Sequence, residues 1–197
     1  MERLRKFLDF IEELIITLFV FILISTYIFR IFSINGDSMC STLESGDRII
    51  ANLLPHNYEQ GDIVVINAKN SVILNDDNSL DISEGINKTI VKRIIATGGQ
   101  TVDMDFSTGA VFIDGERIFE EYLTFGLTHK DEGAFDYPVT VPEGYVFVMG
   151  DNRSESLDSR SNKVGFIPEK DIVGEVIFRI LPTDKFGTLE QEEKRGK

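Results

Sequence analysis

One uncharged stretch near the N-terminus constrains the fold of this chain more than any other part of its sequence. From Leu14 to Phe29 the chain carries no charged residue, and Arg30 can turn its guanidinium toward water, which extends the apolar run to Phe32. A helix that crosses a membrane needs about 17–25 residues. The sequence therefore predicts a transmembrane helix over residues 10–32.

The basic residues predict how this helix is oriented. Three of the first six residues are basic, whereas no basic residue follows Arg30 until Arg48. By the positive-inside rule, residues 1–9 stay in the cytoplasm and the rest of the chain is exported. A cleaved signal peptide has the same order of charged and apolar regions, but here the apolar run is long and no A-x-A-like site follows it. The predicted localisation is therefore the cell membrane, with a single pass and an extracytoplasmic domain.

The composition excludes several classes of partner. A net charge of −13 and a pI of about 4.6 would repel the phosphates of nucleic acid, so we expect no nucleic-acid partner. Cys40 is the only cysteine, which excludes an intramolecular disulfide and a cysteine-based zinc site. His56 and His129 are the only histidines, too few for a histidine-rich metal site. We therefore expect a monomer with no metal and no cofactor.

Beyond the apolar run, the pattern is that of a mainly β domain over residues 33–183. Short apolar or alternating segments are separated by clusters of Gly, Asn, Asp and Pro. These segments are DRIIANL, GDIVVINA, TIVKRIIA, TVDMDF, AVFIDGERI, YVFVMG and DIVGEVIFRIL. Residues 101–118 predict a hairpin, the polar residues 70–88 a surface loop or loose hairpin, and the charged residues 184–197 a frayed tail.

A segment rich in hydroxyl groups, GDSMCSTLESGD at residues 36–47, follows the apolar run. Either it is a stalk that leads into the domain, or it holds Ser38 as a nucleophile close to a membrane. A serine hydroxyl is a weak nucleophile unless a base removes its proton. The usual base is histidine, but His56 follows a proline in a predicted loop and His129 lies in a charged one, so neither is held rigidly.

Lys92 offers a different base. It lies in the predicted strand IVKRII, where alternation places it on the same face as Ile90 and Ile94, while Arg93 points the other way. Apolar neighbours remove water from an ammonium group and lower its pKa, which is what a lysine needs to act as a base near neutral pH. The alternative is an edge-strand lysine that points to water and blocks aggregation.

A third polar segment, GDNRSESLDSR at residues 150–160, follows the predicted strand YVFVM. Its Gly, Asp, Asn and Ser residues are typical of a solvated loop. Its two arginines and two aspartates can instead brace the loop through bidentate ion pairs. A braced loop suits a functional site better than it suits a linker.

Together these segments resemble the bacterial type I signal peptidases, Ser-Lys proteases that cut signal peptides from exported proteins. GDSMCSTLESGD resembles the serine box of that family, GDIVVI the strand box after it, VKRIIATGG the lysine box and GDNRSESLDSR the last box. The four boxes occur in the family's order behind an N-terminal anchor. The resemblance implies an antiparallel β catalytic domain with a small inserted β region at residues 101–142.

The resemblance also implies roles for individual residues. Ser38 would be the nucleophile, Lys92 the general base, and Ser156 the residue that orients the lysine amine. Further support would come from Gly36, Arg153, Asp158 and Arg160. The pocket for the small residue before the cut would be formed by Phe32, Ile34, Asp37, Met39 and Val91.

The implied partners are the lipid bilayer and exported preproteins with small residues one and three places before the cleaved bond. Two departures from the family pattern concern efficiency more than identity. Ser41 stands where proline is usual, and Gly36 stands where a serine hydroxyl often helps the oxyanion hole. The backbone N–H of Ser38 would then have to contribute more.

Other interpretations stay open. The endoplasmic-reticulum and archaeal type of signal peptidase has histidine where Lys92 stands. Self-cleaving repressors share Ser-Lys chemistry but bring a DNA-binding domain and no anchor. Cys40 is close enough to Ser38 in sequence to act in a cysteine peptidase, and a catalytically inactive, membrane-anchored binding domain would keep the same β scaffold.

Overall fold

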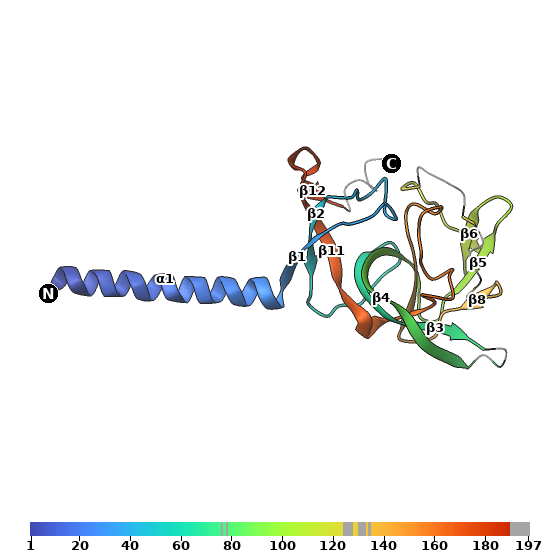
Figure 1. Cartoon of the computed structure of the whole chain (residues 1–197), viewed down its shortest axis with the longest axis horizontal. Helices are drawn as coiled ribbons and strands as arrows, with labels where there is room; N and C mark the ends of the chain where they lie inside the picture. Colours follow the sequence, from blue (N-terminus) through green and yellow to red (C-terminus); the bar gives the residue numbers. More distant parts are fainter. Residues whose placement is uncertain (76, 78, 124–127, 130–132, 134, 190–197) are drawn as a thin grey trace.

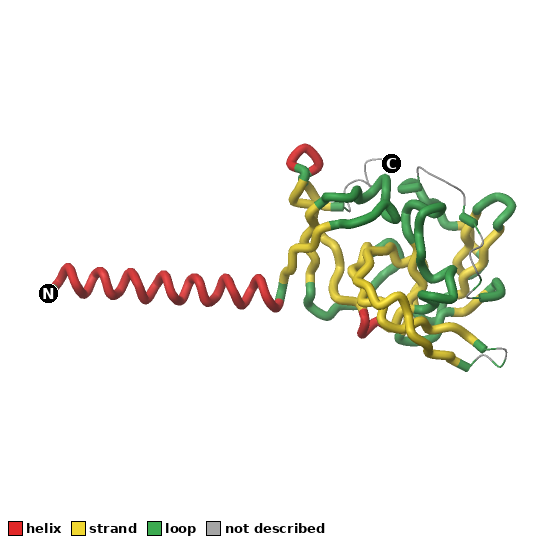
Figure 2. The backbone as a smooth tube through the Cα atoms, viewed as in Figure 1, coloured by secondary structure: helices red, strands yellow, loops and turns green. Residues whose placement is uncertain are grey.

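The computed structural model describes residues 1–75, 77, 79–123, 128–129, 133 and 135–189. A long N-terminal helix, α1 (Glu2–Tyr27), extends away from a β domain (Figure 1). Beyond Tyr27, the described chain is strand and loop apart from two short helical turns (Figure 2). The prediction of a mainly β, antiparallel fold is confirmed, because neighbouring strands in both sheets run antiparallel.

The larger sheet has eight strands in the order β1-β2-β11-β3-β4-β9-β10, with β12 paired to β11. Its long central hairpin, β3 and β4, lines one side of the site described below. The strands are β1 (Phe29–Ser33), β2 (Arg48–Asn52), β3 (Ile63–Leu74), β4 (Leu80–Thr97), β9 (Tyr145–Met149), β10 (Ile167–Pro168), β11 (Ile172–Leu181) and β12 (Gly187–Thr188). The short 3-10 helices η1 (Glu169–Asp171) and η2 (Thr183–Lys185) flank β11.

The smaller sheet has four strands in the order β7-β6-β5-β8 and falls within the predicted inserted region. Its strands are β5 (Thr101–Asp105), β6 (Ala110–Ile113), β7 (Glu116–Arg117) and β8 (Val139–Thr140). The hairpin predicted over residues 101–118 is present as β5-β6-β7. Asp114 and Gly115 form its second turn with φ angles of 54° and 83°, as a two-residue hairpin turn with positive φ at both positions requires.

Three apolar clusters hold the domain together, and one of them positions the serine segment. Met39 and Leu43, on either side of the turn after Ser38, are buried against Ile49 of β2 and Val65 of β3. A second cluster joins the two sheets. A third is formed by side chains of β3, β4 and β9 with residues near β10. Because the turn contributes side chains to the core, the position of Ser38 is set by packing.

The prediction of a transmembrane helix over residues 10–32 is not confirmed. Within the described residues, no helix is both long enough and apolar enough to cross a membrane. Helix α1 ends at Tyr27, and its first half is charged, so that the uncharged part begins at Leu14. At about 1.5 Å per residue, that part is about 21 Å long, shorter than a hydrocarbon core of about 30 Å.

The helix ends early because the residues after it belong to the sheet. Residues 29–33 form β1 and pair with β2 from Phe29 opposite Asn52 to Ser33 opposite Arg48. The backbone groups of β2 need partners along that edge, and this pairing outweighs the continuation of the helix. The β domain therefore begins at Phe29, four residues before the predicted boundary at residue 33.

Two further segments are more ordered than the sequence predicts. Residues 70–88 continue the β3-β4 ladder, from Asn70 opposite Glu84 to Leu74 opposite Leu80, so the hairpin interpretation was the better one. The predicted frayed tail is wrong for residues 184–189, because η2 and β12 return the chain to β11 and Leu189 is buried. Residues 190–197 lie outside the described part of the chain.

Candidate active site

Ser38 lies in the loop between β1 and β2, which the backbone closes on itself. Ile34 N–H donates to the Asp47 carbonyl at 2.9 Å, and Gly46 N–H donates to the Ile34 carbonyl at 2.9 Å. Inside the loop, Leu43 N–H donates to the Met39 carbonyl at 2.8 Å. The loop is therefore a compact turn and not an extended stalk.

Lys92 reaches Ser38 from β4. Its Nζ donates a hydrogen bond to Ser38 Oγ at 2.6 Å, across 54 residues of sequence. The lysine is 2% exposed, because Val64 of β3 lies opposite it in the ladder and Ile94 follows it on the same face. An edge-strand lysine that points to water is thereby excluded. Sequence alternation correctly predicts its burial.

Burial lowers the pKa of Lys92 to about 8, since a desolvated ammonium is less stable than the neutral amine. The carboxylates of Asp158 and Asp151 oppose this shift, and the guanidinium of Arg160 adds to it. An appreciable fraction of Lys92 is therefore neutral near pH 8. A neutral amine in contact with a serine hydroxyl can accept its proton.

The loop at residues 150–161, between β9 and β10, packs directly against the serine turn. Asn152 donates its backbone N–H to the Ser38 carbonyl at 3.0 Å and its side-chain amide to the Asp37 carbonyl at 3.1 Å. A Cβ on Gly150 would collide with the Ser38 carbonyl and with Ser156 Oγ. The two loops thus approach as closely as glycine allows. Nothing in the sequence marks Gly150 or Asn152 for this contact beyond their position within a turn-rich segment.

Ser156 donates its hydroxyl hydrogen to Asp158 Oδ2 at 2.6 Å and does not hydrogen bond to Lys92 within the described part of the chain. The expected bond between Ser156 and the amine is therefore replaced by one that serves the loop. Asp158 also accepts the Gly150 N–H at 3.0 Å and two bonds from the Arg160 guanidinium, at 2.8 and 2.9 Å. Burial alone would raise the pKa of Asp158, but Arg160 and these hydrogen bonds outweigh burial and lower it.

Arg153 braces the same loop from the other side. It is buried, donates from Nε to the Gly150 carbonyl at 3.1 Å and from Nη1 to Thr128 Oγ1 at 2.6 Å, and forms an ion pair with Glu120. Together with the Asp158–Arg160 pair, this arrangement matches the braced loop that the sequence predicts. Glu120, three residues after β7, is a partner that the sequence alone does not reveal.

A second buried ion pair links the strand of Lys92 to this loop. Arg93 donates to both carboxylate oxygens of Asp151, each at 2.9 Å, and its guanidinium lies 3.9 Å from the centroid of the Tyr122 ring. Asp151 also accepts a hydrogen bond from Thr42, in the serine loop. The sequence places Arg93 on the face opposite Lys92, but only the fold shows that it binds the two loops together.

A cavity of about 250 Å³ opens next to Ser38. Of the residues predicted to form the substrate pocket, Phe32, Ile34, Met39 and Val91 line it, whereas Asp37 does not. Gly36 also lines it, with a φ of 105° that strains any other residue. The lining residues that the sequence analysis did not identify are Ser33, Asn35, Val65, Thr89 and Ile90. Most of them are chain neighbours of the predicted lining residues. Val65 reaches the cavity because it pairs with Val91 across β3 and β4.

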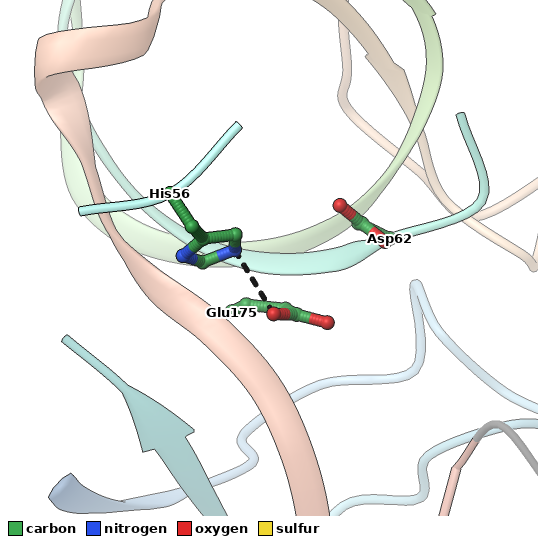
Figure 3. Close-up of side chains that lie close together, drawn as sticks. All are labelled: His56, Asp62 and Glu175. Atoms are coloured by element: carbon green, nitrogen blue, oxygen red, sulfur yellow. Dashed lines mark ion pairs between the residues drawn. The ribbon is translucent and has the colours of Figure 1, made fainter. Parts of the chain in front are cut away.

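The other candidate nucleophile and bases are placed less favourably. Burial, followed by the charge of Asp37, raises the pKa of Cys40 and disfavours its thiolate. His129 is exposed in a loop, where its carbonyl accepts a bond from Arg160. His56 pairs with Glu175 of β11 (Figure 3). Within the described residues, Lys92 is the base in contact with Ser38.

Comparison with known proteins identifies the family of this chain. The sequence model of a family described as "Signal peptidase, peptidase S26" matches residues 7–181. The probable signal peptidase I-1 of Synechocystis sp. is 33% identical over 92% of this chain and 88% of its own length. Signal peptidase I T of Bacillus subtilis is 34% identical over 92% of this chain and 89% of its own length.

Among solved structures, a signal peptidase I from Enterococcus faecalis V583 matches with a TM-score of 0.44 and 24% identity, over 62% of this chain and 98% of that chain. The family match covers most of the sequence and includes all four segments that carry the site. The chain therefore belongs to the signal peptidase family, peptidase S26, whose members are serine endopeptidases.

Proposed function

We propose that this protein cleaves N-terminal signal peptides from exported preproteins, with Ser38 as the nucleophile and Lys92 as the general base. The observation that carries this proposal is the 2.6 Å contact between Lys92 Nζ and Ser38 Oγ, made by a lysine that is buried. A lysine with a pKa of about 8 can accept the hydroxyl proton at mildly alkaline pH.

The reaction follows from these two groups. Neutral Lys92 takes the proton of Ser38 Oγ as the oxygen attacks the scissile carbonyl, and the resulting ammonium returns a proton to the leaving amine. This leaves an ester on Ser38 and the neutral amine on Lys92. Lys92 then activates a water molecule, which hydrolyses the ester. The backbone N–H of Ser38 stabilises the oxyanion, because Gly36 supplies no hydroxyl there.

The substrate class follows from the cavity and from the family. A space of about 250 Å³ with Ile34, Met39 and Val91 in its lining can accept an apolar side chain before the scissile bond, and the preference for a small one is taken from the family. Its apolar walls disfavour a charged side chain, which would lose its hydration there. The remaining supporting roles fall to Ser156, Asp158, Arg160 and Arg153, which hold the loop against the serine turn.

Helix α1 gives a reason for the serine to lie near lipid. None of its residues is buried, and its large apolar side chains are exposed along most of its length. In water this surface would be unfavourable. We propose that α1 attaches the β domain to the cell membrane, on the side where preproteins emerge. β1, which follows α1 directly, leads within a few residues to Ser38.

The test is cleavage of a purified preprotein with an A-x-A site by the detergent-solubilised full chain. Wild-type protein is expected to cut after the second alanine, and Ser38→Ala is expected to lower kcat/KM by at least about 10³-fold. Ser107→Ala, an exposed serine in the small sheet, is the matched control and should have the wild-type rate. Cys40→Ser should also keep its activity.

Two results would contradict the proposal. Wild-type protein that binds but never cleaves the preprotein would identify a catalytically inactive binding domain. A Ser38→Ala protein with wild-type cleavage, combined with an inactive Cys40→Ser protein, would identify a cysteine peptidase.

A further inference from the structure

Three side chains that the proposed chemistry does not use meet where the β2-β3 connection lies beside β11. His56 lies in that connection, Asp62 directly precedes β3, and Glu175 belongs to β11 (Figure 3). Their ligand atoms all lie within 4.8 Å of one another, and His56 Nε2 is 2.9 Å from Glu175 Oε2. The edge of the imidazole ring that carries Nε2 faces the carboxyl groups (Figure 3).

The hydrogen bonding of His56 determines whether Nε2 carries a hydrogen or a lone pair. Its other ring nitrogen, Nδ1, lies 2.8 Å from the carbonyl oxygen of Leu54. A carbonyl oxygen only accepts hydrogen bonds, so Nδ1 carries the hydrogen, and in the neutral ring Nε2 carries a lone pair. A lone pair and a carboxylate oxygen at 2.9 Å repel each other unless a positive charge lies between them. Nε2 is also shielded from water and has no hydrogen-bond partner in the described chain, apart from this ion-pair contact.

The surroundings match those of a metal-binding histidine. Histidines that bind metals usually donate their second ring N–H to a carbonyl or carboxylate, which fixes the ring. The Tyr58 ring, at 4.6 Å between centroids, packs on the same imidazole. Asp62 Oδ2 accepts the Glu59 N–H at 2.8 Å, which orients its carboxyl group.

We propose that His56, Asp62 and Glu175 bind one divalent transition-metal ion of the zinc type. One imidazole nitrogen and two carboxylate oxygens suit such an ion, whose charge of +2 balances the two carboxylates. Ligand atoms around tetrahedral zinc lie about 3.3 Å apart, given bonds of about 2.0–2.1 Å, so small side-chain movements complete the site. A water molecule would occupy the fourth position.

The position of the site indicates a structural role. The metal would tie the β2-β3 connection to β11. The same connection is bonded to β4: Gly61 N–H donates to the Ile94 carbonyl, Ile94 N–H donates to the Asp62 carbonyl, both at 2.8 Å, and Arg93 Nη1 donates to the Gly61 carbonyl at 2.9 Å. A metal at His56 would therefore stabilise the strand that carries Lys92 without contacting substrate.

Zinc binding by the full-length protein in detergent tests the proposal. After treatment with EDTA and dialysis, isothermal titration with ZnCl₂ at pH 7.5 is expected to show one ion per chain with a Kd of about 10 μM or below. His56→Ala and the isosteric Glu175→Gln should each raise this Kd at least tenfold. His129→Ala, which removes the other histidine, should leave it unchanged. At about 100 times the Kd, zinc should raise the wild-type Tm by about 5 °C and leave the Tm of His56→Ala unchanged.

Glu175→Gln keeps the test decisive if His56→Ala does not fold. The proposal is overturned if wild-type protein shows no saturable one-to-one binding, or if His129→Ala weakens binding as much as His56→Ala. It is also overturned if the His56 ring resonances, followed by NMR, do not change when zinc is added. That result would show that His56 does not bind the ion. Cleavage activity is not a readout here, so failure of this proposal and failure of the proposed peptidase function are distinguishable.

Discussion

Lys92 is the residue on which the proposed reaction depends most directly. Lys92→Met keeps the length and most of the volume of the side chain and removes the amine that contacts Ser38 Oγ. We expect kcat/KM for an A-x-A preprotein to fall by about 10²–10⁴-fold, which is the contribution of a general base. The variant should be at least as stable to urea as the wild type at pH 7, because a buried amine costs free energy that methionine does not.

Lys88→Met is the control, since Lys88 lies on the same strand but is exposed. It should behave as wild type in both assays. The pH dependence gives a second readout: because the neutral amine is the base and its pKa is lowered to about 8, kcat/KM should rise between pH 6 and pH 9 with its midpoint near 8. A flat profile, or an active Lys92→Met protein, would contradict the assignment.

Ser41 shows why a departure from the family pattern can be an adaptation. Its φ is 86°, and its hydroxyl donates to the Tyr122 carbonyl at 2.6 Å. Proline, usual at this place in the family, requires a φ near −65° and cannot adopt this conformation. Ser41→Pro should therefore lower the free energy of unfolding by about 1–3 kcal/mol in urea denaturation and reduce cleavage as well.

Ser41→Gly separates the two contributions of Ser41. Glycine keeps the positive φ and loses only the hydrogen bond, so we expect a loss of about 1 kcal/mol or less. If Ser41→Pro proved as stable as wild type, the turn would tolerate the family's proline and the conformation of Ser41 would have no bearing on stability.

At the scale of elements, the loop between β9 and β10 depends on Asp158. This buried carboxylate accepts bonds from Arg160, Ser156 and the Gly150 N–H, and its charge favours protonated Lys92. Asp158→Asn leaves the buried Arg160 without its partner and should lower the free energy of unfolding by about 3–5 kcal/mol. Protein that remains folded should have its activity profile shifted to lower pH, because the pKa of Lys92 falls further.

Glu155→Gln removes an exposed carboxylate from the same loop and should change neither stability nor the pH profile. The shift of the profile is the informative measurement, since a purely structural loss would lower activity at every pH equally. A shift to higher pH would show that Asp158 does not act on Lys92 through its charge.

At the scale of the whole molecule, helix α1 and the β domain depend little on each other. No residue of α1 is buried, and among the described elements its main contacts are with the adjoining β1. A chain that lacks residues 1–27 should therefore fold without detergent, with a Tm within about 2 °C of the full chain measured in parallel. It should cleave a short soluble peptide at nearly the full-length rate but lose about tenfold or more on a preprotein embedded in lipid vesicles, since anchoring raises the effective concentration of the two partners.

A truncated chain that aggregates, or that melts well below the full-length protein, would show that α1 contributes to the fold. Equal cleavage of the vesicle-bound preprotein by both chains would show that α1 contributes nothing to finding the substrate.

The sequence by itself predicts most of the β segments and nominates the two residues of the proposed catalytic pair. Hairpin residues 101–118 and the β segments follow from alternation and turn residues, which act over a few neighbouring positions. Alternation places Lys92 among isoleucines, and the resemblance of residues 36–47 to the serine box of the signal peptidases points to Ser38. Local preferences for strands and turns can be predicted from sequence because each depends on residues that are adjacent in the chain.

Only the tertiary structure decides where the helix ends and which side chains meet. Residues 29–33 form a strand because β2 offers hydrogen bonds to them, which no local pattern reveals. The contact of Lys92 with Ser38, the Arg93–Asp151 pair and the cluster around His56 join residues whose partners are fixed by sheet order and loop packing. Pairing across a sheet releases free energy that depends on the whole set of partners, so these contacts follow from the complete fold and not from the order of residues in any one segment.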